Sequence, residues 1–212
     1  AEILTKFTAD DTQANKAIDS LGENLQKLEK IGKVAFVGLA TAVDVFTVKT
    51  LKAGIAYNAE METLNVRLET LTGSAEEADK VMDQIRKDAV STPFDVASLT
   101  QAESLLISTG LSADESRDAI LALGNAVSAT GGGNAELQRM AVNLQQIKNV
   151  GKASSLDIKQ FAYAGIDVYG LLADSMGITR EEATQLDITY DMLVDALQGA
   201  SKEGGKFYGA MD

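Results

Sequence analysis

The stretch that decides the fold is GLSADE, Gly110 to Glu115. Glycine can adopt the left-handed conformation that ends a helix, Ser112 can cap the next helix, and Glu115 can bond back to the backbone N–H of that cap. These six residues therefore predict that one helix ends, the chain turns briefly, and another helix begins.

The same arrangement occurs twice more in the chain. Gly73 is followed by Ser74 and Glu77, and Gly177 is followed by Thr179 and Glu182. Short links of this kind between helices favour antiparallel neighbours in a compact bundle.

A fourth helix start is expected at Thr92-Pro93-Phe94-Asp95. Thr92 would be the cap, Pro93 would occupy the first helical position, and Asp95 would take the box position. Pro93 is the only proline of the chain, and most of the 18 glycines fall between periodic apolar segments. Both features favour a protein built of helices.

We therefore expect an all-α fold, in which long N-terminal helices are followed by a compact multi-helix bundle joined by short glycine and capping-box turns. A boundary near Gly73 would separate an N-terminal domain (1–72) from a compact helical domain (73–212). The N-terminal domain would hold an arm, a short coiled-coil-like helix and a long apolar helix. The bundle helices are expected at about 75–90, 93–109, 113–129, 134–150, 155–163, 167–176, 180–185 and 189–203.

The three consecutive glycines of SATGGGNAEL, Ser128 to Leu137, raise the question of a phosphate-binding loop. Such a loop needs a strand before it and, in its Walker form, a lysine after it. A helix-like segment precedes these glycines and no Lys-Ser/Thr pair follows them. We expect instead that the glycines end one helix and that Asn134 caps the next, with Glu136 near the positive end of its dipole.

Composition excludes several kinds of chemistry. The chain has no cysteine, histidine or tryptophan, which rules out disulfides, thiolate nucleophiles, Cys/His zinc sites and Ser-His-Asp relays within it. The net charge of -12 disfavours attraction to a nucleic-acid backbone. AEILTKFTADD, residues 1–11, lacks the features of a signal peptide.

Neighbouring carboxylates are the remaining candidates for catalysis or metal binding. The pairs Glu76/Glu77, Asp114/Glu115 and Glu181/Glu182 all fall in the first turn of an expected helix. Caps and the helix dipole account for acidic residues in that position. We expect no enzyme, no catalytic or metal-binding residue and no cofactor.

Apolar residues in the first expected helix, which starts near residues 10–12, are spaced by alternating steps of four and three. A coiled-coil seam of this kind would join copies of the chain, whereas an amphipathic helix would lie on its own domain. Two heptads leave both interpretations open. The residues of the seam are Ala14, Ile18, Leu21, Leu25 and Leu28, of which the last four are candidate partner-binding residues.

The segment Val34 to Val48 is almost entirely apolar and is interrupted by Asp44. As a helix it would be about 22 Å long, which is shorter than the ~30 Å hydrocarbon layer of a membrane. Either the helix is covered by a partner or by the rest of the fold, or it is hidden in one state and meets a membrane in another. Its candidate partner-binding residues are Phe36, Val37, Leu39, Val43 and Phe46. A more charged helix, Leu51 to Leu71, is expected to follow.

Several separate blocks of the sequence, in collinear order, strongly resemble the tape measure domain of tailed-phage and prophage tail-length proteins. The resemblance covers about three quarters of the chain. The blocks are GIAYNAEMETL (54–64), LTGSAEEADKVMDQI (71–85), STPFDVASLTQAESLLISTG (91–110), ALGNAVSATGGG (122–133), LQQIKNVGKASSLDIKQFAYAGIDVYGLLADSMGI (144–178) and GGKFYGAMD (204–212).

The resemblance implies a structural virion protein that lies in the tail lumen and is in the host cytoplasm during assembly. The tail tube polymerises around such proteins, their downstream helical length sets tail length, and they leave before the DNA on infection. Implied partners are further copies of the chain, the tail tube, tail chaperones and baseplate or tail-tip proteins. Specific nucleic-acid binding is not expected. The alternative function is a membrane-active module that inserts residues 34–48 during DNA delivery.

Length limits what this part of such a protein can do. Even a single helix of all 212 residues would measure only about 320 Å, and the glycine joints fold the chain much shorter. We therefore expect an N-terminal domain that anchors or initiates assembly, with the ruler following after Asp212.

Overall fold

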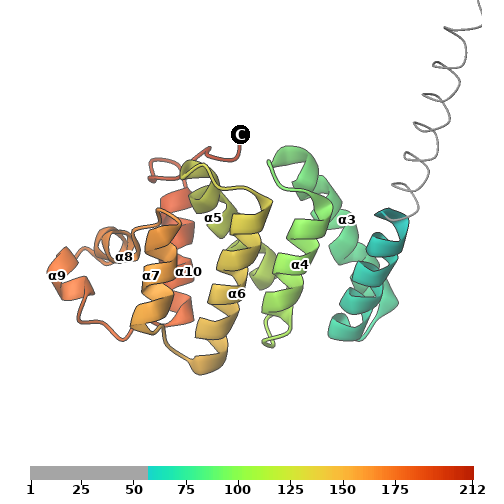
Figure 1. Ribbon diagram of the computed structural model, residues 1–212, viewed down its shortest axis with the longest axis horizontal. Helices are drawn as coiled ribbons and strands as arrows, with labels where there is room; N and C mark the ends of the chain where they lie inside the picture. Colours follow the sequence, from blue (N-terminus) through green and yellow to red (C-terminus); the bar gives the residue numbers. More distant parts are fainter. Residues whose placement is uncertain (1–56) are drawn as a thin grey trace, which may run out of the picture. The chain divides into compact units, whose positions relative to one another are not determined.

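The computed structural model describes residues 57–212, and a compact unit spans Asn58–Asp212. Its described residues form helices and turns and contain no strand, so the expected all-α class is confirmed for this part of the chain (Figure 1). Of the predicted N-terminal domain, only residues 57–72 are described. The boundary near Gly73 therefore stays a prediction.

The helices begin and end close to the positions that the sequence predicts. Residues 57–72 are helical. The helices that follow are α3 (Ala75–Ser91), α4 (Val96–Ile107), α5 (Ala113–Ala129), α6 (Asn134–Val150), α7 (Ser155–Tyr163), α8 (Val168–Met176), α9 (Arg180–Ala183) and α10 (Tyr190–Ser201).

Two of the three predicted capping boxes are complete. The Ser112 hydroxyl accepts a hydrogen bond from the N–H of Glu115, and the Glu115 carboxylate accepts one from the N–H of Ser112 at 2.9 Å. Thr179 and Glu182 exchange the same two bonds at the start of α9. Each box satisfies backbone donors that the first turn of a helix leaves without a partner.

The third joint forms only half of its box. Ser74 caps α3 by accepting from the N–H of Glu77, but the Glu77 carboxylate accepts from the ammonium of Lys80 at 2.9 Å. Lys80 lies three residues further along the helix, where side chains of one face meet. The glycine before each of the three joints has the expected positive φ: +72° at Gly73, +91° at Gly110 and +66° at Gly177.

The predicted start of α4 at Pro93 is wrong. Thr92 is an extended residue that ends α3, and Asp95 is the cap of α4, accepting from the N–H of Ser98 at 2.7 Å. The later start leaves Phe94 outside the helix, and its ring is buried in the core. Burial of a phenylalanine contributes about 2 kcal/mol, which exceeds what one further turn of helix would add.

The predicted cap at Asn134 is also wrong. Gly133 is the cap residue of α6 and offers no side chain, whereas Asn134 is the first helical residue. The Asn134 amide oxygen accepts from the N–H of Asp95 at 3.1 Å, and its NH2 group donates to the Asp95 carboxylate. Asn134 thus gives hydrogen-bond partners to the N–H and the carboxylate of Asp95 at the start of α4, because α4 and α6 pack side by side.

The glycine run ends a helix, as the sequence predicts. Helix α5, and not a strand, directly precedes it, and Gly131 has a φ of +79°. A Cβ at Gly132 would come within 2.7 Å of Val127 Cγ1 and 3.0 Å of Glu136 Cγ. This close approach of α5 and α6 explains the need for glycine there.

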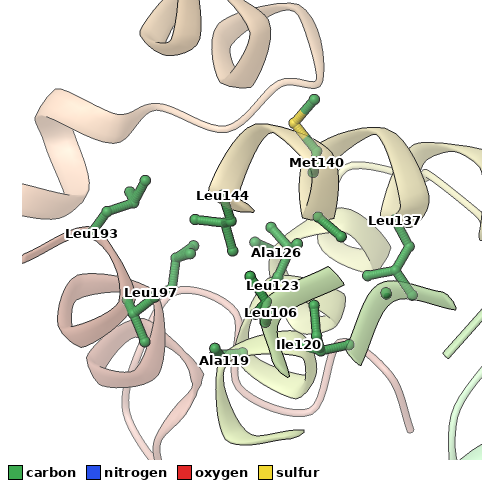
Figure 2. Close-up of a cluster of buried hydrophobic side chains, with 14 of the residues drawn as sticks. Leu106, Ala119, Ile120, Leu123, Ala126, Leu137, Met140, Leu144, Leu193 and Leu197 are labelled. Atoms are coloured by element: carbon green, nitrogen blue, oxygen red, sulfur yellow. The ribbon is translucent and has the colours of Figure 1, made fainter. Parts of the chain in front are cut away.

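The hydrophobic core lies where α4, α5, α6 and α10 meet. Figure 2 shows side chains of α5 and α6 facing one another, with Leu193 and Leu197 of α10 beside them. Leu123 of α5 and Leu144 of α6 are completely buried there. Leu64 and Leu68, from the helical residues 57–72, belong to the same core.

Candidate functional site

The partner-binding residues predicted from the sequence lie outside the described residues. They are Ile18, Leu21, Leu25, Leu28, Phe36, Val37, Leu39, Val43 and Phe46. The coiled-coil and membrane interpretations of these segments therefore stay predictions. Within residues 57–212, no helix is both long and apolar enough to cross a membrane.

In each of the three carboxylate pairs of the first helical turns, at least one member has a structural partner. Glu76 and Glu77 both contact the ammonium of Lys80, at 3.0 and 2.9 Å. Glu115 and Glu182 close the two capping boxes. Across the described part of the chain, acidic residues do not gather in threes in a way that could hold a metal ion.

An ion pair between the buried Asp88 and the partly exposed Arg117 joins α3 to α5. The Nε and Nη2 atoms of Arg117 donate to the two carboxylate oxygens of Asp88, at 2.6 and 2.8 Å. Gln84 Nε2 donates a further hydrogen bond to Asp88 at 3.2 Å. This forked geometry is the strong form of the Arg–carboxylate pair, and Asp88 holds three donors as a result. The hydrogen bonds to Asp88 are the largest cause of the raised pKa of Arg117.

A second buried carboxyl group, Glu103 of α4, lies near this pair. Only 1% of Glu103 is exposed, and its Oε1 atom has no hydrogen-bond partner. Burial raises the pKa of Glu103 to about 8; the charge of Asp88 adds to this rise, whereas Arg117 opposes it. Glu103 is consequently protonated at neutral pH, because an ionised carboxylate without donors is costly in the interior.

Glu103 lines a recess of about 480 Å³ between α3, α4 and α5. Figure 1 shows α3 and α4 side by side at one end of the described unit. The wall also includes charged residues of both signs. They are Glu77, Lys80, Asp114 and Arg117. The recess therefore combines an accessible volume with a buried oxygen that lacks a donor.

Sequence reasoning missed this cluster, although a signal for it exists. Glu103 falls at a core position of α4, since Leu99, Ala102, Glu103 and Leu106 follow the i, i+3, i+4, i+7 spacing of one helix face. Asp88 likewise lies on the buried face of α3, three residues after Ile85. A carboxylate on the apolar face of a helix marks a buried charge that needs a partner.

Comparison with known proteins identifies one family. The family model described as "Tape measure protein" matches residues 52–212. No curated protein and no solved structure matches the chain.

Proposed function

The chain belongs to the tape measure protein family, and we propose that it acts as a structural component of a phage or prophage tail, in tail assembly and length determination. The family match over residues 52–212 carries this proposal, because it covers the whole compact unit Asn58–Asp212.

Within that role, the compact unit anchors or initiates assembly and does not measure length. Among α3 to α10, the longest helices are α3, α5 and α6, which have 17 residues each and are about 25 Å long. They pack on one another around a shared core, so their lengths do not add along an axis. A ruler needs extended helix, which other parts of a tape measure protein would supply.

The partners that we propose follow from the same role. Copies of the chain would associate through the seam formed by Ile18, Leu21, Leu25 and Leu28. The segment 34–48 would contact the tail tube, a tail chaperone or a baseplate or tail-tip protein. The protein would be in the host cytoplasm during assembly and then in the tail lumen, which it would leave before the DNA during ejection.

Tail lengths measured by electron microscopy test the proposal. An in-frame deletion in a long helical region of the same tape measure protein, outside residues 58–212, should shorten tails by about 1.5 Å per deleted residue. Leu123→Ala, which removes a buried side chain from the compact unit, should lower the number of tails without changing their length.

The matched control is Val90→Ala. Val90 is 90% exposed, so its truncation should affect neither the number nor the length of the tails. Unchanged length after the helical deletion would refute the ruler function. A change of length with Leu123→Ala would show that the compact unit itself helps to measure.

A further inference from the structure

The exposed face of α7 carries two large apolar side chains on either side of one cation. Leu156 is 61% exposed and Tyr163 is 77% exposed. Lys159, also exposed, lies between them and has no ion-pair partner among residues 57–212. The three residues follow the i, i+3, i+7 spacing of one helix face, which is the pattern of a helix that docks in a groove.

A groove of about 240 Å³ between α5 and α10 has the complementary character. Leu111 and the ring of Tyr190 are apolar parts of its wall. Four carboxylates also line this α5–α10 groove, without a lysine or arginine in the wall. They are Glu115, Asp118, Asp191 and Asp195.

Neighbouring cations compensate only part of this charge. The ammonium of Lys148, from α6, lies 3.3 Å from Asp191. Nη1 of Arg117 lies 3.9 Å from Asp118, but the Nε and Nη2 donors of the same guanidinium are engaged in the ion pair with α3. Asp195 is exposed and has no ion pair or hydrogen bond with other described residues. The groove therefore keeps free carboxylate charge for an incoming cation.

Tyr190 adds an unused hydrogen-bonding group to the groove. The residue is only 5% exposed, yet its hydroxyl bonds to no group of residues 57–212. This hydroxyl is not one of the unpaired oxygens that are closed off from solvent, so it opens toward the groove that Tyr190 lines. Because a buried phenol usually has a hydrogen-bond partner, the groove offers a ready acceptor to an ammonium donor.

We propose that α7 of one copy of the chain docks in the α5–α10 groove of a second copy. The ammonium of Lys159 lies among the carboxylates of Asp191 and Asp195, and the flanking apolar side chains of α7 cover the apolar wall. Charge complementarity favours a second copy as the occupant, because α7 itself carries the cation and the apolar anchors that the groove lacks. The two surfaces differ, so the contact is head-to-tail. It depends neither on the role in the tail nor on the N-terminal seam.

Cross-linking between two full-length variants tests this contact. The chain has no cysteine, so each variant carries one reactive thiol. Ala162→Cys places it on α7 at an exposed position that leaves the three docking residues intact, and Gln198→Cys places it in the wall of the groove. The mixture is treated with a short bismaleimide, and mass spectrometry of tryptic peptides should find bridges between positions 162 and 198.

The matched control replaces Ala162→Cys by Val90→Cys, because Val90 is 90% exposed and belongs to α3. Bridges from position 90 should form much more slowly than those from position 162. Equal rates, or bridges only between two copies of position 198, would overturn the proposal. Leu21→Ser with Leu25→Ser should leave the 162–198 bridge in place, since the seam is a separate contact; loss of the bridge in that variant would overturn its independence.

A charge exchange identifies the ion pair. Lys159→Glu in the Ala162→Cys chain should slow bridging at least about tenfold, because it brings like charges together. Asp195→Lys in the Gln198→Cys chain should restore bridging to the Lys159→Glu chain. Lys87→Glu makes the same charge change at an exposed position of α3 and should leave the rate unchanged. Equal slowing by Lys87→Glu, or no recovery in the exchanged pair, would contradict the contact of Lys159 with the groove.

Discussion

Arg117 of α5 holds Asp88 of α3 through two hydrogen bonds of 2.6 and 2.8 Å, between residues 29 positions apart in the chain. The Asp88 side chain is only 6% exposed and that of Arg117 is 30% exposed, so the carboxylate lies out of water while the guanidinium keeps some contact with solvent. The contact ties the end of α3 to the first half of α5 across the side of the recess.

Arg117→Met should destabilise the protein by roughly 3 kcal/mol, because it leaves a buried carboxylate without its cation. The matched control is Arg86→Met, which breaks the exposed pair with Asp83 and should cost less than about 0.5 kcal/mol. Urea unfolding followed by circular dichroism measures both. The double variant Asp88→Asn with Arg117→Met should recover part of the loss, and equal effects of the two single arginine variants would contradict a buried pair.

Stability should fall as pH rises from about 5 to 8, because of Glu103. Its pKa is about 8 in the folded protein against an ordinary value of 4.5, so between these values the folded state holds a proton that the unfolded state has lost. The stabilisation is complete below pH 4.5 and is lost as pH rises through the folded value, with a slope of at most about 1.4 kcal/mol per pH unit.

A comparison of the native protein with Glu103→Gln isolates the contribution of Glu103 to the pH dependence of stability. The carboxyl groups of Glu115, Asp167 and Glu182 have lowered pKa values, so their contributions are lost on acidification, in a lower pH range than that of Glu103. The difference in unfolding free energy between the two proteins should change with pH only where Glu103 titrates. A constant difference from pH 5 to pH 8.5 would mean that Glu103 ionises normally.

Gly124→Ala should destabilise the protein by about 1 kcal/mol, although alanine is the better helix former. A Cβ at this position in α5 would lie 2.9 Å from Met211 Sδ and 3.0 Å from Cε2 of the buried Phe94 ring. Overpacking of about 1–3 kcal/mol then outweighs a helix gain of about 1 kcal/mol. Gly199→Ala in α10 meets nothing within 4 Å and should raise stability instead, by up to about 1 kcal/mol. Thermal unfolding that ranks the two variants in the opposite order would refute the contact with Met211.

Replacing Leu21 and Leu25 by serine should lower the oligomeric state if residues 10–28 form an intermolecular seam. Both leucines fall on the predicted a/d positions, where apolar knobs pack into a partner helix. Light scattering after size-exclusion chromatography gives the mass. A mass unchanged from that of the native chain would favour the alternative, an amphipathic helix that lies on its own domain.

Leakage of dye from liposomes tests the membrane interpretation of residues 34–48. If the segment inserts, the chain should release dye and Phe36→Asp should abolish release, because a charge on the apolar face opposes transfer into lipid. Phe161→Ala is unsuitable as a control, since Phe161 is buried in the core. Tyr163→Ser, at an exposed position of α7, should leave release unchanged. Absence of leakage from the native chain at every pH and lipid composition would count against insertion.

Sequence alone determined the helical class of residues 57–212 and nearly every helix boundary. Those signals are local: a glycine, a capping hydroxyl and a glutamate act over six residues, as in Gly110 to Glu115, and need no distant partner. The start of α4 shows where local reasoning fails, because burial of Phe94 in the core overrides the helix start that Thr92 and Pro93 predict.

Only the tertiary structure decided which side chains meet. Asn134 carries a capping amide that satisfies Asp95, 39 residues earlier, and Asp88 receives Arg117 from another helix. The sequence places Glu103 on the apolar face of α4. Only the packing of α3 and α5 around it shows that its Oε1 atom has no hydrogen-bond donor. Helix packing brings together residues that are far apart in the chain, so the partners of a buried charge depend on the core that surrounds it.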